Sequence, residues 1–455
     1  MRSVMRKFTL PAVLLPLLAT TAWAWYPYSE KYERWQEPRP LTYAAMHNCV
    51  PRDCLPERMA RFAAANLNTL IWFKPMPGCH MFQAAHDAGL AWACGTRGGQ
   101  EAVAAALAIP GCAFIIAGDE PGSTEALDQI AAISDWVRRT YPDLPVFANL
   151  SITKVDHDSY IQKCKPDLFS FDEYPLLRDG KLAQTYLYDL AWGRQTASRY
   201  RLPYWMFLQA FGREHERPDY AYRVPGEADL RFLVFSFLAH GGTGIMFFIY
   251  YGFPEAMVMD LGVEDPERSP AENHRYENTV MTAAWYAVRE VAPEVQNLAR
   301  ALLNLRTKDQ VMYAGDGTFW EQPPPTYPNN NPAEPIRLQA FAGHGALRSI
   351  RVVEGQDLGL MIGFLEDEAG QEYFMMVNLA HGLNMSKMDG VRRVRLTFDR
   401  SVEQVERLSR FTGDVETLRT HPQEEAAVLD MSLEGGTGDL FKWSNGKPWR
   451  LRQAP

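Results

Sequence analysis

Residues 113–120 read Ala-Phe-Ile-Ile-Ala-Gly-Asp-Glu, a short apolar run that ends in two carboxylates. A run that is apolar at nearly every position is typical of a parallel β-strand buried on both faces. Seven further runs of this kind occur at residues 41–48, 68–73, 90–96, 146–150, 168–174, 204–211 and 244–251. Helix-like segments separate them, among them residues 56–65, 101–108, 125–139, 182–200, 227–240 and 273–305. Eight βα units in this order predict an α/β fold, a closed (β/α)8 TIM barrel.

The character of the sequence changes after Leu305. Residues 322–335 are rich in Pro and Asn, which disfavours regular structure. Three short strand-like runs follow, at residues 358–364, 372–377 and 393–398, with turn residues between them. We therefore expect the barrel over residues 25–310 and a small all-β, sandwich-like domain over residues 311–455, with the Pro/Asn-rich loop near its start.

The first 24 residues have the composition of a secretory signal peptide. Three basic residues precede an apolar run, and Ala22-Trp23-Ala24 fits the small-x-small rule for cleavage. Cleavage there changes the formal charge from −9 to −12. We expect a periplasmic or secreted protein without a membrane anchor after cleavage, and the acidic charge argues against nucleic acid as a partner.

Six cysteines follow the predicted cleavage site: Cys49, Cys54, Cys79, Cys94, Cys112 and Cys164. An even number of cysteines in an exported chain predicts disulfides. We expect one or two bridges in the first half of the chain, with the connectivity left open. The sequence has no paired CxxC, and its histidines do not sit at ligand spacing. We therefore expect no metal site and no cofactor.

The active site of such a barrel lies at the carboxyl ends of its strands. Two of these ends carry adjacent acids, Asp119-Glu120 and Asp172-Glu173. Alternation along a strand predicts that one member of each pair faces the barrel axis. Glycoside hydrolysis requires a protonated carboxyl group and a second carboxylate, so two acidic strand ends at one rim favour that chemistry.

These segments resemble the glycoside hydrolase barrel superfamily. The resemblance is carried by Gly-Asp-Glu-Pro at 118–121, Phe-Asp-Glu-Tyr-Pro at 171–175, Val-Asn-Leu-Ala at 377–380 and Gly-Thr-Gly-Asp-Leu-Phe-Lys-Trp at 436–443. It implies that Glu120 is the general acid/base, and that Asp172 and Tyr174 contact the sugar.

The second carboxylate remains open at this point. In the largest clan of these barrels a nucleophilic Glu ends the seventh strand, but here that strand ends in Gln209-Ala210-Phe211. The Asp172-Glu173 pair is the first choice, and Glu214 or Glu216 is the fallback. Asp119-Glu120 also resembles the pair of N-acetylhexosaminidases that use the substrate's acetamide as the nucleophile. A third hypothesis is a non-catalytic carbohydrate-binding barrel.

Further polar and aromatic side chains at strand ends are candidates for contacting a carbohydrate substrate. They are His47, Asn48, Trp72, Arg97, Asn149, Tyr174, Gln209, Tyr250 and Tyr251. Trp205 stands at the start of its strand and is expected to pack in the core. No GxSxG or HExxH motif is present in the sequence, which argues against serine hydrolases and zinc proteases.

Overall fold

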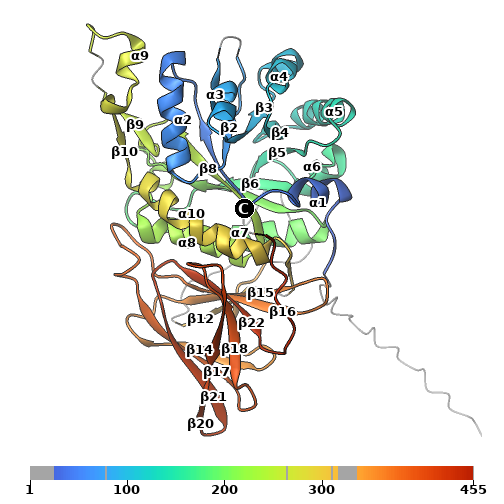
Figure 1. Cartoon of the computed structure of the whole chain (residues 1–455), viewed down its shortest axis with the longest axis vertical. Coiled ribbons are helices and arrows are strands. Elements are labelled where there is room, and N and C mark those ends of the chain that lie inside the picture. The colour runs from blue at the N-terminus through green and yellow to red at the C-terminus, as the bar shows by residue number, and fades with distance from the viewer. Residues whose placement is uncertain (1–24, 77–78, 263–264, 309–310, 316–335, 454–455) are drawn as a thin grey trace, which may run out of the picture.

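The computed structural model describes residues 25–76, 79–262, 265–308, 311–315 and 336–453. The predicted signal peptide and the loop at 322–335 lie outside these ranges. Eight parallel strands form a closed barrel, since β8 pairs with both β7 and β1 (Figure 1). They are β1 Thr42–His47, β2 Thr69–Trp72, β3 Ala91–Gly95, β4 Cys112–Asp119, β5 Val146–Ser151, β6 Phe169–Glu173, β7 Tyr204–Gln209 and β8 Gly242–Tyr251. The predicted (β/α)8 TIM barrel is confirmed.

Helices surround the barrel. They are α2 Leu55–Ala64, α3 Met81–Asp87, α4 Gly99–Leu107, α5 Thr124–Thr140, α6 His157–Cys164, α7 Tyr186–Arg199, α8 Glu227–Ala239 and α10 Ala283–Leu302. No helix in the described ranges is long and apolar enough to cross a membrane.

The prediction of one long helix over residues 273–305 is wrong in its first part. The chain there forms α9 Pro270–Asn273, a 3-10 turn and β10 Thr279–Met281, which pairs antiparallel with β9 Val258–Asp260. Thr-Val-Met favours a strand because β-branched side chains pack well in a pleated sheet, and Thr282 then precedes α10 as its N-cap residue. The two strands and α9 form an arm beside α2 (Figure 1).

The inside of the barrel is filled by large apolar side chains and closed by α1, Glu30–Gln36. Trp205 is fully buried there, with ring centroids 5.9 Å from Trp35 and 5.2 Å from Phe114. Its indole N–H donates to the Tyr32 hydroxyl at 3.1 Å. The predicted core position of Trp205 is confirmed.

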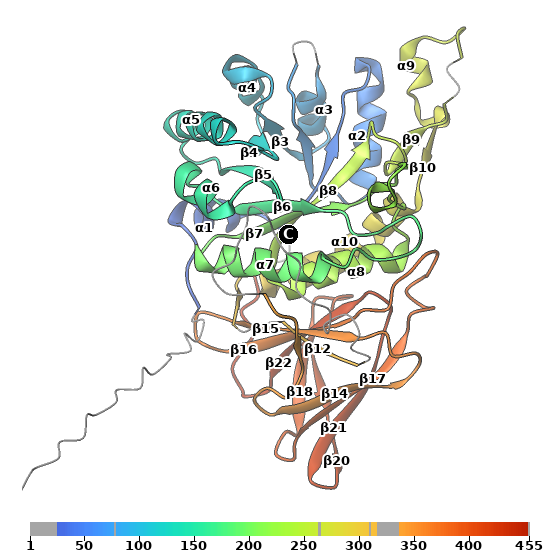
Figure 2. The same ribbon diagram turned by 180° about the vertical axis from the view of Figure 1, so that it is seen from behind.

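The remaining strands form a β-domain of two sheets that share one apolar core (Figure 2). One sheet has the order β13-β12-β15-β16-β22-β18-β19, with β11 beside β15, and the other has the order β14-β17-β21-β20. The bounds are β11 Arg306–Thr307, β12 Met312–Ala314, β13 Gln339–Ala340, β14 Leu347–Glu354, β15 Leu360–Glu366, β16 Glu372–Asn378, β17 Arg392–Asp399, β18 Gln404–Leu408, β19 Val415–Arg419, β20 His421–Gln423, β21 Ala426–Leu433 and β22 Gly438–Trp443. The predicted all-β domain after the barrel is confirmed.

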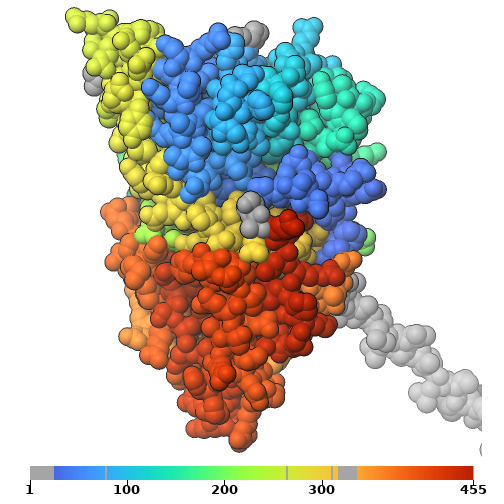
Figure 3. All heavy atoms as spheres, in the orientation of Figure 1, coloured from blue at the N-terminus to red at the C-terminus, as the bar shows by residue number. Residues whose placement is uncertain are grey.

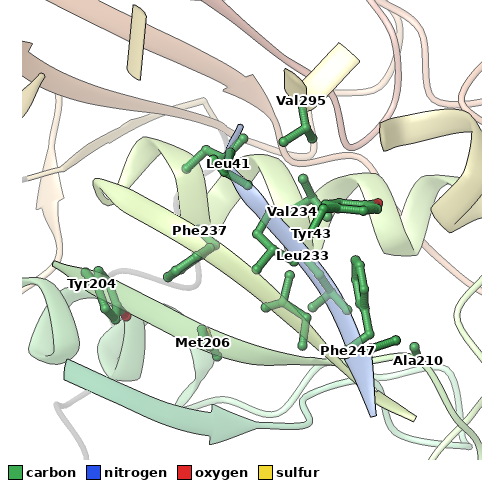
Figure 4. Packing of buried hydrophobic residues seen from close by; sticks show 14 of the residues in the cluster. Leu41, Tyr43, Tyr204, Met206, Ala210, Leu233, Val234, Phe237, Phe247 and Val295 are labelled. Atoms are coloured by element: carbon green, nitrogen blue, oxygen red, sulfur yellow. The ribbon is translucent and has the colours of Figure 1, made fainter. Parts of the chain in front are cut away.

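Helix α8 lies between the barrel and the β-domain, and the two parts meet along a broad face (Figures 1 and 3). Every residue of α8 from Ala228 to Ala239 is buried. On one side Leu233, Val234 and Phe237 lie close to the barrel strands, as Figure 4 shows. On the other side Gly363 of β15 lies so near the carbonyl of Ala239 that a β-carbon would collide with it. The barrel therefore shares this helix with the β-domain.

One disulfide, between Cys49 and Cys79, joins the loop after β1 to the segment before α3. The other four cysteines are free thiols. The prediction of one or two bridges in the first half of the chain is confirmed.

Candidate active site

A cavity of about 940 Å³ opens at the carboxyl ends of the barrel strands. Its lining includes seven of the predicted site residues: Arg97, Asp119, Glu120, Asn149, Asp172, Glu173 and Tyr174. All four acids of the two pairs line this cavity. In β4 the register shifts between Ile116 and Gly118, and Glu120 leaves the strand with a φ of 45°. The alternation that the prediction assumed is interrupted there.

Asp119 is held in place from both sides. Its carboxylate accepts hydrogen bonds from Arg97 Nη2 at 2.9 Å and from Asn149 Nδ2 at 3.2 Å. The amide of Asn149 is itself fixed, because Ser170 Oγ donates to its oxygen at 3.2 Å. Burial nevertheless raises the pKa of Asp119, and the Asn149 and Arg97 contacts only partly oppose this.

Glu120 and Asp172 meet across the cavity. Lys154 Nζ, from the loop after β5, donates to Glu120 Oε2 at 2.5 Å. The carboxyl group of Asp172 lies near that of Glu120 and near the hydroxyl group of Tyr174. Burial raises the pKa of Asp172 well above its usual value, and the neighbouring charges of Glu120 and Asp119 raise it further. The neighbouring carboxylates therefore favour the protonated form of Asp172.

Glu173 faces a different carboxylate, Asp189 of α7. Burial raises the pKa of Glu173 well above its usual value, and the charges of Asp189 and Asp172 add to the effect. Asp189 also lines the cavity.

Aromatic rings from β8 and from the loops after β6, β7 and β8 form one wall of the cavity. Tyr174 lies 5.1 Å from Phe211 and 5.6 Å from Phe248, measured between ring centroids, and Phe253 lies 5.1 Å from Phe211. Tyr222 is the fifth ring of this wall, 5.5 Å from Phe211. Aromatic planes of this kind can pack against the apolar faces of pyranose rings.

Six predicted substrate contacts do not line the cavity: His47, Asn48, Trp72, Gln209, Tyr250 and Tyr251. His47 and Tyr250 are fully buried and stack with centroids 5.2 Å apart, and Trp72 packs on Phe82 at 5.5 Å.

The other three make hydrogen bonds outside the cavity. Asn48 Nδ2 donates to the carbonyl of Gly252 at 2.8 Å. The hydroxyl of Tyr251 bonds to Asp260 and to His274. Gln209 is buried and makes hydrogen bonds to the loops after β6 and β7. Glu214, the fallback choice for the second catalytic acid, is exposed and forms an ion pair with Arg178 at 2.7 Å.

The polar residues of the site that the sequence hypothesis missed include Lys154, Asp189, Arg213 and Tyr222. Each comes from a loop or a helix and not from a strand end. A search restricted to strand ends could not find them. Within the described residues, no three His, Cys, Asp or Glu side chains are grouped so that they could hold a metal ion.

No family model and no curated protein matches the sequence. Solved structures similar to the chain include a glycoside hydrolase, with TM-score 0.44, 11% identity and coverage of 89% of this chain and 91% of that one. They also include a GH27 β-L-arabinopyranosidase from Geobacillus stearothermophilus, with TM-score 0.41, 10% identity and coverage of 92% and 100%. A β-galactosidase from Marinomonas ef1 has TM-score 0.40 and 13% identity, with coverage of 56% of this chain and 60% of that one. At this level of likeness, the fold assignment rests on the strand pairing of the chain itself.

Proposed function

We propose that this chain is an exported glycoside hydrolase that cleaves an oligosaccharide or polysaccharide with a pair of carboxyl groups. The observation that carries the proposal is the pair of neighbouring carboxyl groups of Glu120 and Asp172 in the cavity at the carboxyl ends of the strands. Glycoside hydrolysis needs a carboxyl group that keeps its proton beside one that has lost it.

The electrostatics favour Asp172 as the acid, whereas the sequence hypothesis gave that role to Glu120. Burial and the neighbouring carboxylates raise the pKa of Asp172, which favours its protonated form. Glu120 is paired with the ammonium group of Lys154 and is suited to act as the nucleophile. Asp172 would protonate the leaving oxygen while Glu120 attacks the anomeric carbon. Asp172 would then deprotonate the water that releases the sugar.

A mechanism with Glu120 as the nucleophile implies retention of configuration at the anomeric carbon. A smaller hollow of about 270 Å³ shares Phe73, Arg97 and Asp119 with the main cavity. Together the two hollows support a substrate of more than one sugar unit.

Export is supported by the sequence of residues 1–24 and by the Cys49–Cys79 disulfide, since stable disulfides are typical of proteins outside the cytosol. Mass spectrometry of the protein recovered from periplasm and medium would give its first residue. A chain that keeps its first 24 residues in the cytosol would contradict export.

The first test of the activity is reducing-end release from a panel of plant and bacterial polysaccharides and from aryl glycosides. Asp172→Asn and Glu120→Gln are run beside the wild type, with Glu214→Gln as the matched control outside the cavity. We expect release by the wild type and the control, and a loss of several orders of magnitude in the two cavity variants. Release that survives both substitutions would contradict the assignment, and sugar binding without release would favour the non-catalytic binding barrel.

A further inference from the structure

Several buried polar atoms have no hydrogen-bond partner in the described part of the chain, at a place outside the candidate active site. They are Arg58 Nε and Nη1, Arg61 Nε, the Tyr250 hydroxyl and Trp285 Nε1. The four residues are at most 5% exposed. Native proteins rarely leave so many buried donors unpaired, and such groups indicate an ion or a water that completes them.

These side chains come together from three elements around Tyr250 of β8. Arg58 and Arg61 lie one turn apart on α2, and Phe62, the residue after Arg61, packs on Tyr250 with ring centroids 4.8 Å apart. Both guanidinium charges lower the pKa of the Tyr250 hydroxyl, against the larger opposite effect of burial. The indole of Trp285, from α10, approaches the same hydroxyl. We refer to Arg58, Arg61, Tyr250 and Trp285 as the α2–α10 donor cluster.

The cluster carries more positive than negative charge. Arg58 Nη2 donates to Asp260 at 3.2 Å and to the carbonyl of His274 at 2.9 Å. Arg61 donates to the neutral hydroxyl of Thr279 at 2.5 Å and lies over the ring of Tyr276 at 3.7 Å. Asp260 is shared with the hydroxyl of Tyr251, and Glu57 is exposed on α2. Two buried guanidinium groups thus face one half-buried carboxylate, that of Asp260.

His47 adds no charge to this region. Its Nδ1 donates to the carbonyl of Asn48, and burial lowers the pKa of its ring to about 3. The unpaired groups of the cluster are guanidinium N–H, indole N–H and phenolic O–H, all of which can donate. Donors with an excess positive charge suit an anion and not a cation.

We propose that the α2–α10 donor cluster binds a small monovalent inorganic anion of the size of chloride. The anion neutralises the guanidinium group of Arg61, which has no carboxylate partner among the contacts above. It accepts hydrogen bonds from side chains of α2, β8 and α10. It thereby ties α2 and α10 to the β9–β10 arm, which already contacts Arg58 through Asp260 and Arg61 through Thr279. The role is structural and independent of the proposed glycosidase activity.

The first test measures the Tm of the mature protein in sodium chloride and in sodium methanesulfonate at the same ionic strength. A bound anion stabilises the folded state by mass action, so we expect a Tm about 2–4 °C higher in chloride. Arg61→Met and Trp285→Phe should lose most of this difference. Arg199→Met removes an arginine of α7 that pairs with Asp158, and should keep it. Equal Tm values in the two salts for the wild type would overturn the proposal.

The second test needs no variant and so does not depend on a variant's folding. Crystals of the wild type grown in sodium bromide should show an anomalous bromine peak within hydrogen-bond reach of Arg61 Nε and Trp285 Nε1. A map with ordered water and no bromine signal at the cluster would overturn the proposal. Neither readout depends on sugar cleavage, so an inactive protein with a bromine peak would refute the proposed function and leave the anion site standing.

Discussion

Glu120 and Asp172 are carboxylic acids in one cavity, yet they face different charges. Lys154 pairs with Glu120, whereas Asp172 lies beside the carboxylates of Glu120 and Asp119. We therefore expect a proton shared by the pair to reside on Asp172. The two acids therefore differ in the charges around them, which come from the loop after β5 and from the end of β4. Their own side-chain chemistry does not cause this difference.

Substitutions at the two acids should separate their roles by the leaving group. Asp172→Asn should slow hydrolysis of a dinitrophenyl glycoside little, because that leaving group needs no proton, but should slow an alkyl glycoside about 10²–10⁴-fold. Glu120→Gln should slow both by several orders of magnitude. Steady-state kinetics on the two substrates check this. Equal losses for Asp172→Asn on both substrates would return the acid role to Glu120.

Glu173 should make the stability of the protein depend on pH. Its pKa is raised in the folded state by burial and by Asp189, so its protonated form is favoured there. The contribution of Glu173 to the free energy of unfolding is fully present below the pKa of Glu in the unfolded chain, about 4.3. This contribution is lost as the pH rises through the raised pKa of the folded state. The free energy of unfolding of the wild type should therefore fall from pH 5 to pH 8 more than that of Glu173→Gln.

Denaturant titrations at both pH values measure this, with a slope of at most about 1.4 kcal/mol per pH unit from one group. Glu214→Gln should follow the wild type, because Glu214 is exposed. Parallel pH dependence in Glu173→Gln and the wild type would contradict a raised pKa at Glu173.

At the scale of elements, the barrel strands could be predicted because each is buried on both faces. Their ends also located the two acidic pairs. The helices were harder to predict, since Thr279-Val280-Met281 lies in the predicted last helix but forms a strand that pairs with β9. Lys154 and Asp189 could not be predicted, since a loop and a helix bring them to the cavity and strand order gives no information on either.

Gln209 shows how a strand end can shape a site that it does not line. Its side chain accepts from the N–H of Leu176 at 2.8 Å and donates to the carbonyls of Leu176, Phe211 and Arg223 at 2.9–3.3 Å. These bonds fix the loops that carry Tyr174 and Tyr222 of the aromatic wall. The residue was predicted to contact the substrate, and the structure gives it buried backbone partners.

Gln209→Leu should lower both stability and activity. It leaves buried backbone groups unpaired, so we expect a loss of about 2–4 kcal/mol in the free energy of unfolding. The value of kcat/KM should fall because the aromatic wall shifts. Urea denaturation and steady-state kinetics measure the two effects. Unchanged stability would mean that the loops do not depend on Gln209.

At the scale of the whole molecule, buried charges join the barrel to the β-domain. Arg231 of α8 pairs with Glu294 of α10 at 2.7 Å, and Arg410 of the β-domain reaches the same Glu294 at 3.0 Å. Arg410 also pairs with Glu434 and Asp439. The network crosses the interface at the level of α8.

Arg410→Met should therefore destabilise the whole chain, because it removes the cation that Glu294, Glu434 and Asp439 share. Removing one partner of a buried pair costs about 3–5 kcal/mol. Calorimetry should show one transition at a lower Tm, with Arg395→Met, which breaks the peripheral pair with Asp430, as the control. Two separate transitions in the wild type would contradict a shared interface.

Helix α8 is dry on both sides, whereas the outer helices of a barrel usually face water on one side. Its backbone amides can therefore meet solvent only when the barrel and the β-domain come apart or unfold. Hydrogen–deuterium exchange in α8 should be the slowest in the chain and should report the global free energy of unfolding. The exchange rate of the α8 amides would then report how a substitution in either domain changes the global stability of the protein.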